Sequence, residues 1–143
     1  MTYTFQVTLD CRDPHAQAEW WAETLGWAVE SQDEAFIRRM IAEGHASEDD
    51  TIVHGGALMW RDGSAITSPD PGTPRVYFQA VPEPKAGKNR MHLDVRIGRE
   101  ADLDAAVAAL EARGAGRLWR ESQGPFAWVT MTDPEGNEFC VSP

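Results

Sequence analysis

Cysteine is scarce in this sequence: there are only two, Cys11 and Cys140, near opposite ends of the chain. A disulfide-stapled fold needs several cysteines, and a zinc finger or ribbon needs closely spaced cysteine or histidine pairs. Neither pattern is present. We therefore expect two reduced thiols, with Cys140 acting as a small, buried apolar residue.

Basic residues are also in short supply, with 13 Lys and Arg against 23 Asp and Glu, for a formal net charge of −10. A phosphate backbone would be repelled, so nucleic-acid binding is excluded as a function. No apolar run reaches the roughly 20 residues that a membrane span requires. The N-terminus lacks the basic start and apolar stretch of a signal peptide. These absences predict a cytoplasmic protein with an acidic surface.

What the sequence does contain is a repeated unit. Segments Phe5 to Cys11 and Met91 to Ile97 both alternate apolar and polar residues, and an amphipathic helix follows each. The segments lie 86 residues apart, an offset that aligns Gln6 with His92. A duplicated unit builds a paired architecture with its site where the copies face each other. The length of 143 residues predicts one domain, residues 1–143.

The first copy is predicted to span residues 1–82. Asp13-Pro14 is typical of a helix start, with Asp13 as the N-cap, and Gly26 is a natural stop. An insertion with helical character is expected at about 34–50. The remaining elements are a strand at Thr4 to Cys11, a strand at Ile52 to Arg61 that Gly55-Gly56 could break, a loop at Ser64 to Thr73 and a strand at Arg75 to Val81.

The second copy, residues 88–143, is predicted to have the order βαβββ. Its helix carries an apolar stripe that includes Leu103, Val107 and Leu110. Residues Asp133 to Asn137 form a strong turn signal between two apolar segments. The predicted strands are Met91 to Ile97, Arg117 to Glu121, Trp128 to Thr132 and Glu138 to Val141.

This arrangement resembles the vicinal oxygen chelate superfamily, which includes glyoxalase I, bleomycin-resistance proteins and extradiol dioxygenases. The specific matches are Leu25-Gly26-Trp27, Val81-Pro82-Glu83-Pro84-Lys85, Lys88-Asn89-Arg90-Met91-His92-Leu93-Asp94 and Thr132-Asp133-Pro134-Glu135-Gly136-Asn137-Glu138-Phe139. The resemblance covers nearly the whole chain and is narrowest to the glyoxalase-like subgroup. It implies an α+β fold of two βαβββ modules that form a partly closed, barrel-like sheet around a cavity, with the helices outside.

The resemblance also implies where a metal would be held. Metal-using members take one ligand from the first strand and one from the last strand of each module. Carried over, the first-strand positions are Gln6 and His92, and the last-strand position of the second module is Cys140, where metal enzymes of the family carry Glu. In the first module it falls near Gln79, with Tyr77 as the alternative. Because hard divalent ions prefer carboxylates and imidazoles, we expect no complete metal site, and only Gln6 and His92 as its remnant.

Two residues are candidates for catalysis. His92 could bind a ligand, but a hydrogen bond to Asp94 or to the backbone is the simpler expectation. Glu138 shares a face with Cys140, two residues away, so a shift in register could offer it as a metal ligand or base. A charge at the rim, beside the turn, is the simpler reading of Glu138. The expected ligand-binding residues are Gln6, Thr8, Gln79, His92, Asp94, Trp128 and Cys140.

These residues predict a metal-free protein that binds a small organic molecule. The resemblance to bleomycin-resistance proteins implies sequestration as its role. The alternative is a lyase, isomerase or dioxygenase that uses a divalent metal (Zn, Ni, Mn or Fe) and acts on a vicinal-oxygen substrate. A third possibility is a dimeric interaction module without a ligand. Because the family often pairs subunits, we expect a homodimer, with neither a nucleic acid nor a membrane as partner.

Overall fold

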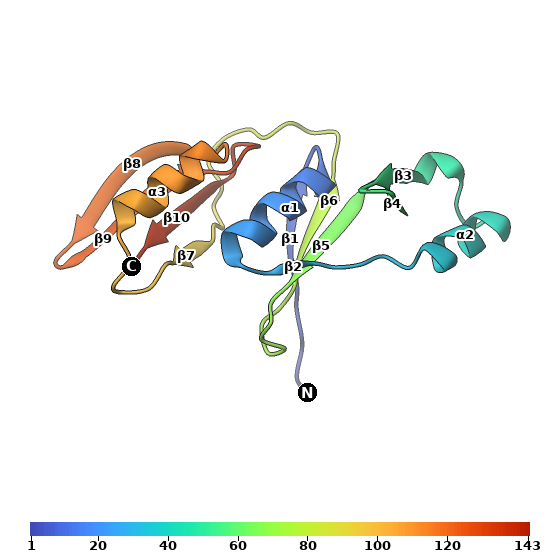
Figure 1. Cartoon of the computed structure of the whole chain (residues 1–143), viewed down its shortest axis with the longest axis horizontal. Coiled ribbons are helices and arrows are strands. Elements are labelled where there is room, and N and C mark those ends of the chain that lie inside the picture. The colour runs from blue at the N-terminus through green and yellow to red at the C-terminus, as the bar shows by residue number, and fades with distance from the viewer. The chain divides into compact units, whose positions relative to one another are not determined.

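The computed structural model describes residues 1–143, which divide into two compact units, Met1–Pro84 and Lys85–Pro143. Each unit contains a four-stranded mixed sheet with a helix packed against it (Figure 1). The predicted α+β class is confirmed, and neither sheet closes into a barrel by itself. No helix is both long enough and apolar enough to cross a membrane.

The four-stranded sheet of the first unit has its first strand at one edge. From one edge to the other the strands are β1 (Val7–Cys11), β6 (Val76–Ala80), β5 (Gly63–Thr67) and β2 (Ala28–Val29). Strands β1 and β6 are parallel, and the other neighbours are antiparallel. Along β1 the more exposed residues Thr8 and Asp10 alternate with the more buried ones, as the sequence pattern predicts.

Helix α1 (Pro14–Leu25) covers one face of this sheet. The Asp13 carboxylate accepts hydrogen bonds from the backbone N–H groups of His15 and Ala16, and so caps the first turn. Gly26 ends the helix at φ 66°, in the left-handed region that favours glycine. Both predicted helix ends are therefore confirmed. The buried core between helix and sheet consists of Ala18, Trp21, Ala22, Ile66, Val76 and Phe78.

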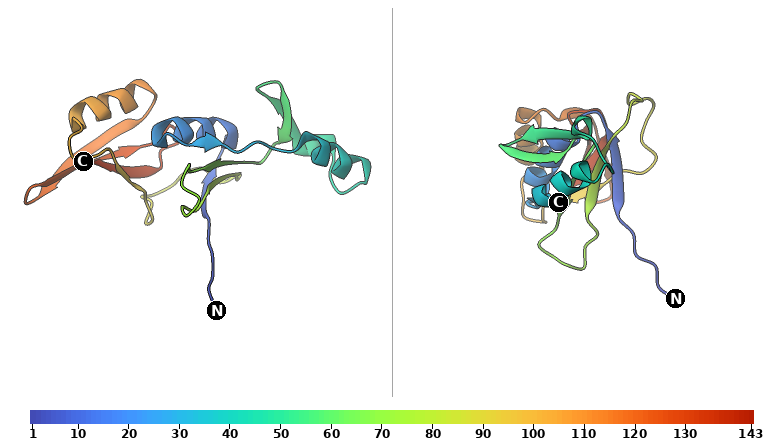
Figure 2. Two further views of the ribbon diagram at one scale, coloured as in Figure 1. Left: turned by 60° about the horizontal axis from the view of Figure 1, so that its bottom comes forward. Right: turned by 90° about the vertical axis from the view of Figure 1, so that its right-hand side faces the viewer.

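The insertion of the first unit is longer than predicted and continues through residue 60. It comprises helix α2 (Glu34–Ala42), the short 3₁₀ helix η1 (Glu48–Asp50) and strands β3 (Thr51–His54) and β4 (Ala57–Trp60). Gly55 and Gly56 both have positive φ, so β3 and β4 form a hairpin and not one strand. Figure 2 shows this insertion reaching away from the four-stranded sheet of its own unit.

One predicted loop of the first unit is wrong. Residues 64–73 were expected to be a loop, but Gly63–Thr67 is strand β5, an interior strand of the sheet. Small side chains made the segment resemble a loop in sequence. Here they fit a tightly enclosed position, since β5 packs under α1 and Ser64 is only 3% exposed. The loop itself begins after Thr67.

The second unit repeats this topology. Its strands, in the same order, are β7 (Asp94–Arg96), β10 (Glu138–Ser142), β9 (Phe126–Thr132) and β8 (Gly116–Gln123), and its helix is α3 (Leu103–Ala112). Strands β7 and β10 are parallel, as β1 and β6 are. The predicted order βαβββ is confirmed, although β7 is shorter and β8 longer than expected.

The turn before the last strand is held by one buried carboxylate. Asp133, which is 2% exposed, accepts hydrogen bonds from the backbone N–H groups of Glu135 and Asn137 and from the Asn137 side chain.

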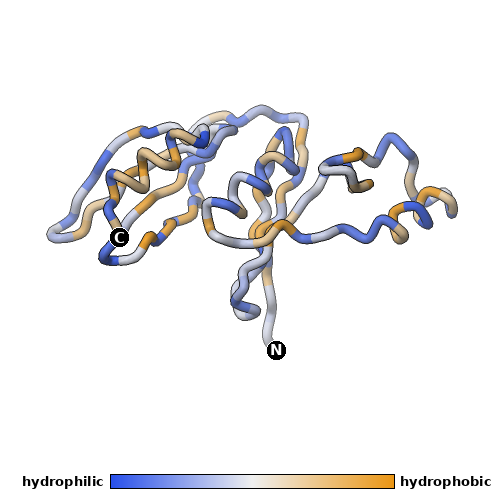
Figure 3. Tube along the Cα trace, in the orientation of Figure 1, coloured by the Kyte–Doolittle hydropathy of each residue, from blue (hydrophilic) through white to orange (hydrophobic).

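Apolar and polar stretches alternate along both units (Figure 3). The buried residues of the second sheet and helix are Val95, Leu103, Val107, Leu110, Val129, Met131, Phe139 and Val141.

Candidate functional site

The second unit contains a hollow of about 740 Å³ beside its sheet. Strands β7, β10 and β9 place Asp94, Cys140 and Thr130 directly opposite one another in one row across the sheet. Because residues on neighbouring strands in register share a face, these three side chains lie together. All the candidate residues predicted in this unit line the hollow: His92, Asp94, Trp128, Glu138 and Cys140.

Three side chains that line this hollow, His92, Asp94 and Cys140, form a compact polar group. His92 Nδ1 and Asp94 Oδ1 are 3.3 Å apart, and donor atoms of His92, Asp94 and Cys140 all lie within 4.8 Å of one another. The Cys140 sulfur is also 3.6 Å from Thr130 Oγ1. Cys140 is half-buried, and not fully buried as the sequence suggested, because it lies on the face of the sheet away from the core.

The chemistry of this group decides which metal ions it suits. A thiolate and an imidazole are good ligands for Zn²⁺, whereas Mg²⁺ and Mn²⁺ prefer oxygen. The three donors therefore fit a borderline ion such as Zn²⁺ and do not fit a hard ion. The side chains of His92 and Asp94 are 37% and 56% exposed. The ligands of a structural zinc site are shielded from solvent, so these residues are too exposed to form one.

The Glu138 side chain is bound by residues of the segment at the start of the second unit. Its carboxylate lies 3.1 Å from Lys85 Nζ and accepts a hydrogen bond of 2.8 Å from the backbone N–H of Asn89. Burial by itself would raise the pKa of Glu138, but these donors and its own backbone N–H outweigh burial and lower the pKa. A carboxylate held ionised in this way is a poor proton acceptor, which favours the structural reading of Glu138.

Aromatic side chains form much of the remaining wall. Trp128, which the sequence identified, is joined by Trp119 and Phe126. Trp119 stands opposite Thr130 in register, so it extends the row of Asp94 and Cys140 to strand β8. Sequence analysis missed Trp119 and Phe126. Phe126 alternates with Trp128 along β9, and this was the available signal for it. Trp119 joins the wall through the pairing of β8 with β9, which the sequence does not show.

The predicted residues of the first unit are arranged differently. The Gln6 side chain accepts a hydrogen bond of 2.9 Å from Arg75 Nε and lies 3.4 Å from Thr8 Oγ1. Gln79 is exposed and pairs in register with Asp10. None of the predicted residues Gln6, Thr8 and Gln79 lines the hollow found in this unit.

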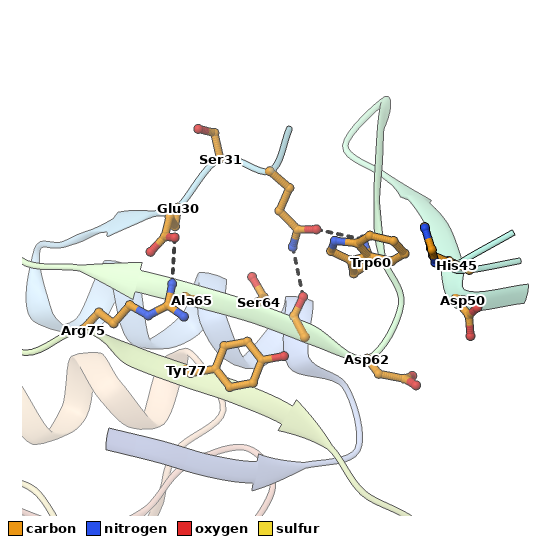
Figure 4. Close-up of a pocket in the computed structure, with 13 residues that line it drawn as sticks. Glu30, Ser31, His45, Asp50, Trp60, Asp62, Ser64, Ala65, Arg75 and Tyr77 are labelled. Carbon is orange, nitrogen blue, oxygen red and sulfur yellow. Dashed lines mark hydrogen bonds and ion pairs between the residues drawn. The ribbon is translucent and has the colours of Figure 1, made fainter. Parts of the chain in front are cut away.

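The hollow of the first unit has a volume of about 570 Å³ and is shown in Figure 4. Arg75 and Glu30 pair at one end of it, at 2.8 Å, and Trp60 lies toward the other end with His45 and Asp50. The ring of Tyr77 lies along strand β6, between these two ends. Of the residues that line this hollow, the sequence analysis named only Tyr77, as the alternative to Gln79, because most of the others come from the insertion and from β5.

The fold and the two repeated sheets define a protein of the paired-βαβββ class. The family model described as "Glyoxalase-like domain" matches residues 6–142, so the chain belongs to the glyoxalase-like domain family. The resemblance to the vicinal oxygen chelate superfamily is thereby confirmed. No curated protein matches the chain significantly.

Solved structures of this fold are distant in sequence. A glyoxalase/bleomycin resistance protein/dioxygenase family enzyme from Burkholderia phytofirmans PsJN is 15% identical, with a TM-score of 0.63 over 96% of this chain and 94% of that one. The fosfomycin resistance protein FosX from Mesorhizobium loti is 10% identical, with a TM-score of 0.60 over 99% and 92%. A mutant FosX from Listeria monocytogenes, complexed with Mn(II) and 1S,2S-dihydroxypropylphosphonic acid, is 9% identical, with a TM-score of 0.63 over 99% and 90%. At these identities the likeness shows the fold alone.

Proposed function

We propose that this protein binds a small organic molecule in the hollow of the second unit, without a complete metal site, and holds it unchanged. The observation that carries the proposal is the composition of that hollow. Three aromatic side chains and one compact polar group, His92, Asp94 and Cys140, line the same volume of about 740 Å³. Small-molecule sites combine apolar walls with a few placed polar groups in this way.

The wall chemistry indicates the kind of molecule. Trp119 and Trp128 offer flat apolar surfaces to a planar group. His92 can donate or accept a hydrogen bond, and Asp94 accepts one. The expected ligand is therefore an aromatic or conjugated molecule with a hydroxyl, amine or amide group at one end.

A thiol in place of a carboxylate at the family's last-strand position supports binding without turnover, and the other carboxylate of the wall, Glu121, is exposed on the neighbouring strand β8. The family positions carried over from the sequence offer Cys140 where metal enzymes carry Glu, and Glu138, the nearest substitute, is paired with Lys85. Asp94 remains as the one carboxylate of the polar group, and it already lies beside His92. FosX, a fosfomycin resistance protein, shares this fold, which supports a role of the resistance type.

Titration calorimetry with a panel of aromatic metabolites and antibiotics tests the proposal. We expect one ligand per hollow, weaker binding by Trp128→Leu, and recovery of the ligand chemically unchanged by mass spectrometry after prolonged incubation. Trp27→Leu removes a half-buried tryptophan that lines neither hollow; it is the matched control and should bind normally. Conversion of the bound molecule, or binding that ignores Trp128, would overturn the proposal.

A second candidate function is favoured by one observation, the closeness of the His92, Asp94 and Cys140 donor atoms. These residues would hold a Zn²⁺-like ion, which supplies Lewis-acid polarisation of a carbonyl oxygen when bound. Trp128 and Trp119 would orient the substrate beside them. If His92→Ala left both the zinc content and the turnover of the purified protein unchanged, this candidate would be eliminated.

We also propose that the protein acts as a homodimer in the cytoplasm. The chain has a mass of 15.9 kDa, so a symmetric pair should elute from size-exclusion chromatography at twice that value. The sequence has only two cysteines, Cys11 and Cys140, and so lacks the disulfide framework of a secreted protein, which supports a reducing compartment. Elution at the mass of one chain across micromolar concentrations would contradict the dimer.

A further inference from the structure

The hollow of the first unit is a second pocket, open to solvent on one side, that the proposed function does not use. At about 570 Å³ it lies within the range of small-molecule sites, and every residue lining it belongs to the first unit. Its walls come from three parts of that unit: the segment after β2, the insertion with β4, and strands β5 and β6 (Figure 4). The insertion therefore encloses a site beside the repeated sheet.

The aromatic walls of this hollow are held in place by specific contacts. Gln32 donates to the carbonyl of Gly63 at 3.0 Å and accepts from the backbone N–H of Trp60 at 2.8 Å, which ties β4 to β5. The Tyr77 ring lies so close to Gly63 that a Cβ there would be 1.9 Å from the phenol oxygen. Glycine is thus required for the ring of Tyr77 to occupy its place along the wall.

The only guanidinium on the wall is already engaged. Arg75 donates to Glu30 at 2.8 Å and to Gln6 at 2.9 Å, and it lies 5.7 Å from the ring centre of Tyr77. Its charge is balanced by Glu30, and two of its donors are used. An anionic ligand would have to break this pair before Arg75 could receive it.

Two further carboxylates on the wall have no cationic partner. The Asp50 carboxylate accepts hydrogen bonds only from the backbone N–H and hydroxyl of Ser47, and the Asp62 carboxylate makes no hydrogen bond or ion pair. With Glu30 they set three carboxylates against the single guanidinium of Arg75. The field inside the hollow is therefore negative.

We propose that this hollow binds a small organic cation, an amine or ammonium compound with an apolar body. The positive group lies near Asp50 and Asp62, where it balances the unpaired charge, and the apolar body lies against Trp60 and Tyr77. Aromatic faces attract cations as well as apolar groups, so both parts of such a molecule find complementary surface. A neutral molecule of the same shape lacks the charge interaction, and an anion is repelled.

Three probes of equal ring size and different charge test this: benzylammonium, benzyl alcohol and benzoate. Binding is followed by chemical shifts of backbone amides in the intact, isotope-labelled chain. We expect benzylammonium to shift the amides of Gly63, Ser64 and Ala65, with at least tenfold weaker binding of benzyl alcohol and none of benzoate. Equal binding of the alcohol, or preferred binding of benzoate, would overturn the proposal.

Single substitutions test where the cation binds. Asp62→Asn, an exposed change that keeps the shape of the side chain, should weaken benzylammonium binding severalfold and leave benzyl alcohol unaffected. Asp10→Asn makes the same change of charge on strand β1 of the same unit, outside the lining of either hollow, and should have no effect on the cation. Normal cation binding by Asp62→Asn together with Asp50→Asn would refute the assignment.

Discussion

Tyr77 and Cys140 occupy the same position in the two repeated sheets. Thr8 pairs with Tyr77 across the parallel strands β1 and β6, and Asp94 pairs with Cys140 across the parallel strands β7 and β10. The offset of 86 residues takes Thr8 to Asp94. The last strand of each repeat therefore presents a phenol or a thiol at this point, and neither presents a carboxylate.

Removing Trp128 should reduce ligand affinity in the second unit. The variant Trp128→Leu keeps an apolar side chain but loses the flat ring, and stacking on an aromatic ring contributes about 0.5–1.5 kcal/mol beyond area burial. We expect a fall in affinity of up to about tenfold, measured by titration calorimetry with the strongest ligand of the panel. Trp27→Leu, at a tryptophan that lines neither hollow, should bind as the parent does, and an equal loss in both variants would indicate a general effect on folding.

The two thiols should differ in reactivity. Cys140 lines the hollow and is half-buried, whereas Cys11 is 6% exposed and lies 3.5 Å from the carbonyl oxygen of Gln79. A disulfide reagent should therefore label one thiol per folded chain quickly and the second only on unfolding. Cys140→Ser should abolish the fast phase, and a bound ligand should slow it. Fast labelling that persists in Cys140→Ser would contradict the described burial.

The ion pair of Glu138 should make stability depend on pH. Because the pKa of Glu138 is lowered in the folded protein, its ionised form stabilises the fold above the ordinary value of 4.5. This contribution is lost as the pH falls through the lowered pKa. At pH 7, Glu138→Gln should lower the melting temperature by a few degrees, and the difference from the parent should shrink in increasingly acid buffer.

A matched control separates this effect from a general charge effect. Glu121→Gln removes an exposed carboxylate from the same sheet and should change the melting temperature little at any pH. A constant difference between Glu138→Gln and the parent from pH 7 to pH 3 would show that the Lys85 and Asn89 contacts do not depend on the charge of Glu138.

The close approach of Gly63 and Tyr77 predicts a second stability effect. A Cβ at residue 63 would overlap the phenol oxygen and lie 2.7 Å from the ring carbon that carries it. We expect Gly63→Ala to lower the melting temperature by several degrees, since overpacking costs about 1–3 kcal/mol. Adding Tyr77→Phe should restore part of the loss, and Gly72→Ala should be nearly neutral. A stable Gly63→Ala protein would contradict the described packing.

Local chemistry made much of the fold predictable. Asp13 and Gly26 mark the ends of α1 because capping depends only on neighbouring backbone groups. The Asp133 turn and the order of the second repeat are similarly visible in the sequence. Strand β5 was not predictable, since Gly63, Ser64 and Ala65 become strand only through pairing with β6 and packing under α1.

The candidate site was likewise predictable only in part. Alternation placed His92, Asp94 and Trp128 on one face, and the structure finds all three around one hollow. Alternation could not choose between Tyr77 and Gln79, because both lie on the same face of β6 and only the pairing with β1 sets the register. The second hollow was invisible, since it is built by an insertion whose contacts are non-local.

The most direct test of the central claim, a binding site without a complete metal centre, is elemental analysis of the untagged protein together with thermal-shift titration by Mn²⁺, Ni²⁺, Zn²⁺ and Fe²⁺. The account predicts well under one equivalent of metal per chain and melting shifts that are small and equal in the parent and His92→Ala. Near-stoichiometric metal, or a large shift that His92→Ala abolishes, would contradict it.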